Sequence, residues 1–166
     1  MIQIKNILIP IDFSSSSYQL FEMGYCFAGQ NNARLHIIHV IDPVYYKEPQ
    51  TKTSDLAFIH KIRLENAKEE LKKFKFELPH SNVEITEVLV EGIPHREILN
   101  YAKQNDIDMI VIASHGWTNL PTKVMGSIAD KIMRQADVPV ICLKSNIPVI
   151  RNRELRRQNF AENWVG

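Results

Sequence analysis

The stretch VIASHGWTNLPTKVMGSIADKI, residues 111–132, changes in character along its length. It begins as a short apolar run and ends as a segment whose apolar residues recur at helical spacing. Between these parts lie Gly116 and Gly126, separated by nine residues, and Ser127 follows directly. A buried strand that leads through a loop into an amphipathic helix is the repeating unit of an α/β fold. The stretch therefore predicts that fold, and it raises the question whether the loop holds a phosphate.

The same alternation of strand and helix extends over most of the chain. Short apolar runs rich in β-branched residues are typical of strands buried in a parallel sheet. They predict strands over residues 4–11, 33–42, 83–92, 107–114 and 138–144. Helical spacing predicts helices over residues 15–29, 55–76 and 93–105, and a fourth from Gly126 onward. Five strands interleaved with four helices indicate a single doubly wound, five-stranded parallel sheet with helices on both faces, a Rossmann-like fold.

Local features of these elements lead to further expectations. Gly29 is expected to cap the first helix, since glycine adopts the left-handed conformation without strain. The strand over 83–92 alternates polar and apolar residues and is expected near an edge of the sheet. Ser14 to Ser17 are expected to act as caps and solvated first-turn residues. The helix after Gly126 carries an apolar stripe of Ile128, Ala129, Ile132, Met133 and Ala136.

The composition is that of an ordinary globular protein, since 45% of the 166 residues are hydrophobic and 23% are charged. The net charge of +1 argues against a nucleic-acid or membrane-surface binder, because both need a clear basic excess. No apolar run approaches the roughly 20 residues of a membrane span, and no signal peptide is visible. Cys26 and Cys142 have no C-x-x-C pattern and are expected as buried free thiols. We therefore expect a cytoplasmic protein.

Residues 1–145 account for the expected α/β domain, and residues 146–166 form a tail outside its alternation. The tail carries four arginines against two acidic residues. Chain ends are frequently frayed, which is one interpretation of this segment. The other is an arm that packs on a second subunit, with Phe160 and Trp164 as anchors.

Candidate ligand-binding residues follow the strands. In doubly wound sheets, ligands bind beyond the carboxyl ends of the strands, where the winding direction reverses. The residues expected there are Asp12, Val40 to Asp42, Glu91, Gly92 and Ala113 to Gly116. At the start of the last helix, unpaired N–H groups of Gly126, Ser127 and Ile128 would point at a phosphate, aided by the helix dipole. By pattern alone, the loop is either a phosphate site or an ordinary strand-to-helix connection.

Two common nucleotide-binding patterns are absent from the sequence. Lys123 precedes Gly126 instead of following it, so the loop is not a Walker P-loop. No G-x-G-x-x-G follows the first strand, so the dinucleotide fingerprint is also missing. The histidines form no H-x-x-x-H or comparable cluster, and no protein-bound structural metal is expected.

The chain resembles the universal stress protein family over nearly all of residues 2–145. The similar segments are KNILIPIDFSSSS, LHIIHVID and IDMIVIASHGWTNLPTKVMGSIADKIMRQADVPVICLK, in the order of the family. Nucleotide-binding members carry G-x-x-G-x(9)-G-[ST], which falls here on Ala113, Gly116, Gly126 and Ser127, with alanine in place of the first glycine. The resemblance implies ATP binding, with AMP or ADP as alternatives and Mg²⁺ or Mn²⁺ on the phosphates. It also implies a homodimer formed through the last strand, Val138 to Lys144.

The resemblance also implies roles for other residues of the site. Asp12 matches an acidic residue that faces the nucleoside, with a helix cap as the alternative. Pro10 and Ile11 match backbone positions beside it. Val40 matches a residue whose backbone and side chain meet the adenine ring, although it also suits the strand core. His115 lies in the loop and has no visible general-acid partner, so it is expected to contact the nucleotide without a catalytic role.

The resemblance implies a regulatory nucleotide with at most slow hydrolysis, because no Walker lysine, arginine finger or general base is evident. Ala113 favours an alternative, a dimeric interaction module without nucleotide. Extended backbone, expected directly after a strand, would tolerate this alanine, whereas a positive φ would cost roughly 1 kcal/mol. A third alternative is an adenylating enzyme of the wider adenine-nucleotide α-hydrolase group. Such enzymes need glycines after the first strand, where this chain has IDFSSSS.

Overall fold

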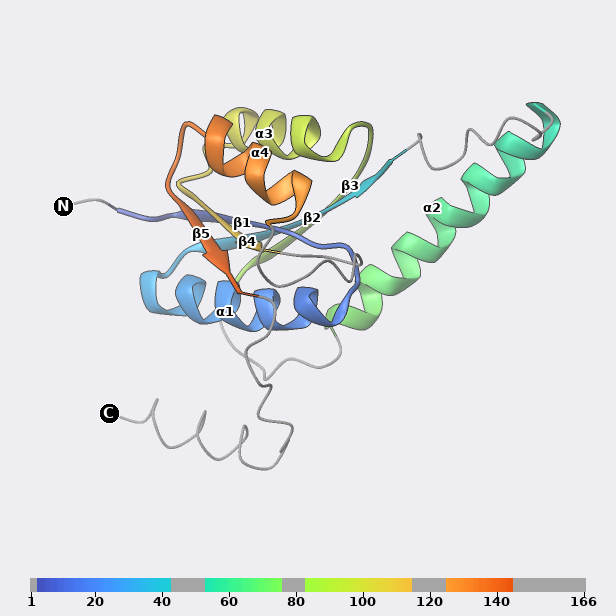
Figure 1. The fold of residues 1–166 in the computed structure, drawn as a ribbon. Helices are drawn as coiled ribbons and strands as arrows, with labels where there is room; N and C mark the ends of the chain where they lie inside the picture. The colour runs from blue at the N-terminus through green and yellow to red at the C-terminus, as the bar shows by residue number, and fades with distance from the viewer. Residues whose placement is uncertain (1–2, 43–52, 76–82, 115–124, 145–166) are drawn as a thin grey trace.

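The computed structural model describes residues 3–42, 53–75, 83–114 and 125–144, except the side chains of Ser15 and of several α2 residues. The strands are β1 (Asn6–Pro10), β2 (Arg34–Ile41), β3 (Ile85–Glu91), β4 (Met109–Ala113) and β5 (Val140–Leu143). The helices are α1 (Ser15–Asn31), α2 (Thr53–Lys75), α3 (Pro94–Gln104) and α4 (Ser127–Gln135). All strand pairs are parallel, in the order β3-β2-β1-β4-β5 (Figure 1). The predicted α/β fold with one five-stranded parallel sheet is confirmed.

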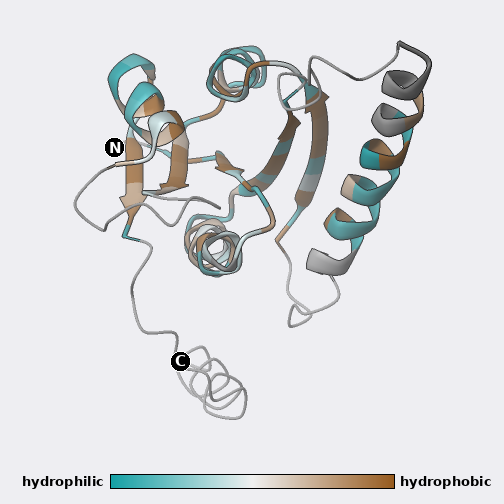
Figure 2. Ribbon diagram, turned by 45° about the vertical axis from the view of Figure 1, so that its right-hand side comes forward, coloured by the Kyte–Doolittle hydropathy of each residue, from teal (hydrophilic) through white to brown (hydrophobic). Residues whose placement is uncertain are grey.

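Helices cover both faces of the sheet, which gives the molecule three layers (Figure 1). Helices α1 and α2 pack on one face, and α3 and α4 pack side by side on the other. The strands are hydrophobic along most of their length, whereas the outward sides of the helices are largely hydrophilic (Figure 2). Right-handed crossovers between parallel strands lead to this arrangement.

The central strands β1 and β4 form the core, with alternate side chains on opposite faces. Ile7, Ile9 and Val111 pack in the cluster beneath α1, and Leu8 and Ile110 pack in the cluster beneath α3 and α4. All five are fully buried. Strands β3 and β5 lie at the edges and are only half-buried, so the edge position predicted for residues 83–92 is confirmed.

The expectation that Gly29 caps the first helix is wrong. Helix α1 continues to Asn31, and Asn32 takes the left-handed conformation with φ 51°. The N–H of Asn32 is directed at the carbonyls of the preceding turn. Asparagine tolerates this conformation better than other non-glycine residues, so either position could end the helix by local preference.

The apolar stripe of α4 is only partly buried. Ala129 and Ile132 lie in the core, but Ile128 and Met133 keep 40% and 45% of their surface exposed. Helix α4 lies beside α3 over the β5 edge of the sheet. At an edge, the sheet covers only part of the helix's wide apolar stripe.

The winding of the sheet reverses between β1 and β4. The chain moves outward from β1 to β2 to β3 on one side and from β4 to β5 on the other. We call the edge at which β1, β2 and β4 end the carboxyl edge; its last strand residues are Pro10, Ile41 and Ala113. Ligands of doubly wound sheets bind at this point.

Candidate functional site

The loop from β1 to α1 holds Asp12 in a fixed position. Oδ1 of Asp12 accepts the Ser14 N–H at 3.0 Å and the Ser17 hydroxyl at 2.7 Å. The N–H of Asp12 donates to the same Ser17 hydroxyl at 3.0 Å. Asp12 therefore closes the turn before α1, although Ser14 and not Asp12 is the N-cap residue. Two hydrogen bonds hold its carboxylate at the carboxyl edge, and a third holds its backbone N–H.

Three of the serines that follow Asp12 are buried, contrary to the expectation that they are solvated. Ser14, Ser16 and Ser17 are all buried. Ser14 is the N-cap residue of α1 by backbone conformation, but its side chain makes no capping hydrogen bond. The sequence suggested caps because serine is common there. The structure instead uses Ser17, in the first turn of α1, to hold Asp12.

Phe13 adopts an unusual backbone conformation between Asp12 and Ser14. Its φ of 62° lies in the left-handed region, which costs a bulky residue roughly 1–2 kcal/mol. Its ring packs against the imidazole of His39, with 4.3 Å between ring centroids. Strained residues of this kind persist where their surroundings fix them, and they cluster at ligand sites.

Strand β2 contributes His39 and Val40 on opposite faces of the sheet. Val40 is half-buried and packs against the core beneath α3 and α4. Nδ1 of His39 lies 2.9 Å from the carbonyl oxygen of Ile11. Because a carbonyl only accepts, Nδ1 carries the proton. Burial lowers the pKa of His39, against the opposing effects of this hydrogen bond and of Asp12.

Ala113 is the last residue of β4 and pairs with Leu143 on β5. It is not among the described residues that have positive φ. The expectation of extended backbone at Ala113 is therefore confirmed, and its backbone has no need of glycine. The next residue, Ser114, is buried, and its N–H donates to the carbonyl of Leu143 at 2.7 Å.

The N-terminus of α4 is tied back to the end of β4. The N–H of Gly126 donates to the carbonyl of Ser114 at 2.8 Å. The expectation of an unpaired N–H at Gly126 is therefore wrong. Ser127 and Ile128 begin the helix with exposed side chains, and N–H groups in a first turn have no acceptor within their own helix.

The structure thus brings most of the predicted site residues to one edge. Pro10, Ile11 and Asp12 follow β1, and the neighbouring strands end near Val40 and Ala113. Helix α4 begins at the same edge with Ser127 and Ile128, directly after Gly126. His115 and Gly116 lie outside the described residues.

Sequence reasoning missed two residues of this edge, His39 and Ser17. The signal for His39 was a polar side chain inside an apolar strand run, which requires a buried partner. Ser17 gave no comparable signal, because its partner depends on how the turn folds.

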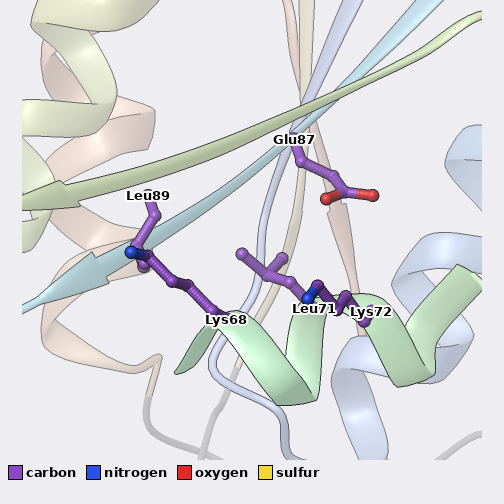
Figure 3. A pocket seen from close by; sticks show the side chains of 5 residues that line it. All are labelled: Lys68, Leu71, Lys72, Glu87 and Leu89. Atoms are coloured by element: carbon purple, nitrogen blue, oxygen red, sulfur yellow. The ribbon is translucent and has the colours of Figure 1, made fainter. Parts of the chain in front are cut away.

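The described residues contain no group of three or more His, Cys, Asp or Glu side chains that could hold a metal ion. Within the same ranges, no helix is long and apolar enough to cross a membrane. A pocket of about 190 Å³ lies between α2 and β3, and Leu71 and Leu89 are part of its lining (Figure 3). Lys68, Lys72 and Glu87 complete its lining, so it shares no residue with the carboxyl edge.

Comparisons with known proteins agree with this architecture. The universal stress protein MJ0531 of Methanocaldococcus jannaschii is 30% identical over 141 residues, which span 84% of this chain and 82% of the relative. The solved structure of UspA from Lactobacillus plantarum has a TM-score of 0.74 at 28% identity and covers 86% of this chain and 99% of its own. For MJ0577 of M. jannaschii, the TM-score is 0.75 at 27% identity, with 86% and 96% covered.

Two further solved universal stress proteins share the fold at lower identity. One, in complex with cAMP, has a TM-score of 0.57 at 20% identity and covers 87% of this chain and 99% of its own. The other, from Archaeoglobus fulgidus in complex with dAMP, has a TM-score of 0.52 at 23% identity, with 86% and 100% covered. The sequence model of the universal stress protein family matches residues 3–144. The chain therefore belongs to the universal stress protein family.

Proposed function

We propose that this chain binds an adenine nucleotide, ATP or its mono- or diphosphate, at the carboxyl edge. Two universal stress proteins of the same fold were solved with cAMP and dAMP, ligands that share an adenine ring, a sugar and a phosphate. The family motif supports a site here, since Gly116, Gly126 and Ser127 keep its spacing. Ala113 is no obstacle, because its backbone is extended.

The observation that carries the proposal is the pair of complementary polar groups on either side of the switch point. Asp12 is a fixed carboxylate at the end of β1, and sugar hydroxyls donate to such oxygens. Ser127 opens α4, where free N–H groups and the helix dipole favour an anion. A carboxylate repels phosphate, so we orient the nucleoside toward Asp12 and the phosphates toward α4.

Within this orientation, each remaining residue has a proposed part. The N–H groups of Ser127 and Ile128 would meet the phosphates, while Gly126 would allow close approach. Val40 would meet the base, and Pro10 and Ile11 would form the floor between base and sugar. His115 and Gly116 join the site on the sequence pattern alone. A Mg²⁺ or Mn²⁺ ion would be coordinated mainly by the phosphates, since such ions take few protein ligands.

The proposed role of the nucleotide is regulatory. A ligand that binds one conformation or assembly better than another shifts the population toward it. The assembly we propose is a homodimer through residues 138–144. Strand β5 has a hydrogen-bonded neighbour on one side only within the described sheet, and an uncovered edge strand is prone to pairing. Exposed Met133 on the adjoining α4 would extend the same contact.

Calorimetry with ATP and AMP tests the proposed function directly. The wild type should bind, and Ser127→Asp should abolish or strongly weaken binding, because a carboxylate would stand where the phosphates are placed. An acidic residue in a first helical turn is favourable, so the fold should persist. Asn100→Asp on the exposed surface of α3 adds the same charge elsewhere and should bind normally. No heat of binding by the wild type at millimolar nucleotide would overturn the proposal in favour of a nucleotide-free interaction module.

A further inference from the structure

We infer that His39 is a positioning residue for the nucleotide base, because its imidazole bonds the carbonyl of Ile11 and leaves the backbone N–H and C=O of Val40, at the carboxyl edge, without a hydrogen-bond partner among the described residues. The inference rests on the proposed function for its ligand. The part that concerns Val40 rests on hydrogen bonds of the described chain alone. A purine base is the class of ligand group that such an open peptide group would recognise.

The register of the sheet fixes the direction of the Val40 peptide group. Successive residues of a strand direct their N–H and C=O groups to opposite neighbours. Toward β1, the Arg34 N–H donates to the carbonyl of Lys5, and the Ile38 carbonyl accepts the Ile11 N–H at 2.9 Å. The backbone N–H and C=O groups of the even-numbered residues of β2 therefore face β1. Val40 is the next even-numbered residue after Ile38.

The odd-numbered residues of β2 confirm this assignment. The Leu35 N–H donates to the carbonyl of Glu84 beside β3, and the Ile41 carbonyl accepts the Gly92 N–H. His39 lies between these two and pairs with Leu89 of β3. Val40 consequently directs both its N–H and its C=O past the end of β1.

One more rung of the ladder would bond the Val40 N–H to the carbonyl of Ile11. Among the described residues, no such backbone bond is present. The Ile11 carbonyl instead accepts Nδ1–H of His39 at 2.9 Å. The side chain of His39 thus bonds the Ile11 carbonyl, which would otherwise accept the Val40 N–H and continue the ladder between β1 and β2.

A second contact of the His39 imidazole, with Phe13, and its burial stabilise the hydrogen bond to Ile11. The ring of Phe13 packs against the imidazole, and the backbone of Phe13 has the left-handed conformation described above. Burial lowers the pKa of His39 and favours the neutral ring, against the smaller opposing effects of the Ile11 hydrogen bond and the Asp12 charge. In the neutral ring, the Ile11 carbonyl requires the tautomer with its proton on Nδ1.

An open peptide group offers one donor and one acceptor side by side. The adenine edge carries a ring acceptor, N1, next to an amino donor, so it complements this pair. A site whose polar groups are built to hydrogen-bond a ligand strongly rejects analogues that leave those groups unpaired. His39 would therefore determine base affinity without touching the base.

The test compares three histidine variants with the wild type. His39→Leu removes the donor, whereas His39→Asn keeps an N–H close to the position of Nδ1. His36→Gln is the matched control, since His36 is a buried histidine of the same strand that bonds Tyr101 and Asn6 instead. Calorimetry measures affinity for ATP and for inorganic tripolyphosphate, and NMR hydrogen exchange follows the Val40 amide without ligand.

We expect His39→Leu to weaken ATP binding about tenfold, the equivalent of one hydrogen bond, and to leave tripolyphosphate binding unchanged. The Val40 amide should exchange more slowly in this variant, because it can now bond Ile11. His39→Asn should restore both readouts, and His36→Gln should alter neither.

Two outcomes would overturn the inference: slow exchange at Val40 in the wild type, or equal losses for ATP and tripolyphosphate in His39→Leu. A wild type that binds no nucleotide would instead overturn the proposed function. The exchange rates would then still decide whether His39 keeps the Val40 peptide open.

Discussion

The hydroxyl of Tyr101 lies 2.8 Å from Nδ1 of His36 and joins α3 to β2 inside an otherwise apolar layer. Nε2 of the same ring faces Oδ1 of Asn6 on β1 at 3.4 Å. An amide oxygen only accepts, so Nε2 carries the proton and the Tyr101 hydroxyl donates to Nδ1. A neutral imidazole on β2 is thus held between Asn6 of β1 and Tyr101 of α3.

Acid is expected to destabilise the fold through His36. Burial, followed by the charge of Arg34, lowers the pKa of His36 below its ordinary value of 6.5, and Glu84 opposes this shift. The unfolded chain therefore binds the proton more readily, so this contribution to stability is complete above about pH 6.5 and declines as the pH falls below it. Urea denaturation from about pH 5 to about pH 8 measures the slope.

His36→Gln should flatten that slope, because glutamine does not titrate. His39 retains a lowered pKa and its own share of the pH dependence. A free energy of unfolding that rises on acidification below neutrality would contradict this assignment.

Two glycines of α1 should respond in opposite ways to alanine. A Cβ at Gly24 would lie 2.8 Å from Cγ2 of Ile9 and 3.2 Å from Leu35, both fully buried. Overpacking of this kind costs about 1–3 kcal/mol, which exceeds the gain of about 1 kcal/mol from removing a helix glycine. At Gly29 the nearest atom, on Val83, is 3.7 Å away, so Gly29→Ala should stabilise by about 0.5–1 kcal/mol. Denaturation midpoints that shift in the same direction would refute the close approach at Gly24.

Ser17→Ala should impair the site more than the fold. It removes two hydrogen bonds to Asp12, so we expect about 1–2 kcal/mol of lost stability and roughly tenfold weaker nucleotide binding. Ser16→Ala is the control, since it removes the hydroxyl of a buried neighbouring serine in the same turn of α1. Calorimetry and urea denaturation of both variants provide the comparison. Equal affinity in the two variants would remove Asp12 from the proposed site.

Ala113→Gly is expected to bring no gain in nucleotide affinity, although it restores the first glycine of the family motif. Ala113 is extended and paired with Leu143, so the glycine would add only backbone freedom. It should lower stability by about 0.5–1 kcal/mol. A calorimetric titration that shows clearly tighter binding would mean that the ligand presses on this Cβ.

The strands and helices could be predicted because each is a local pattern repeated over many residues. The placement of Asp12 at the same sheet edge as the start of α4 also followed, since doubly wound sheets bring the residues after neighbouring strands to one edge. The His39 contact to Ile11 could not be predicted, because it depends on where β1 stops relative to β2. The bond from Gly126 to Ser114 likewise depends on two residues, at either end of the connection from β4 to α4, that meet only after folding. Exposure of Ile128 and Met133 escaped prediction because periodicity gives the width of a stripe and not how much of it is covered.

The hydrogen bond between Ser114 and Gly126 has a consequence for how proteins of this design diversify. At 2.8 Å, it joins the two residues that flank an eleven-residue segment, 115–125: Ser114 directly follows β4, and Gly126 is the N-cap residue of α4. Substitution or replacement of the intervening residues therefore leaves the sheet and α4 where they are. Selection could then vary this segment on a constant frame, and an engineer could graft a different sequence there without redesigning the protein.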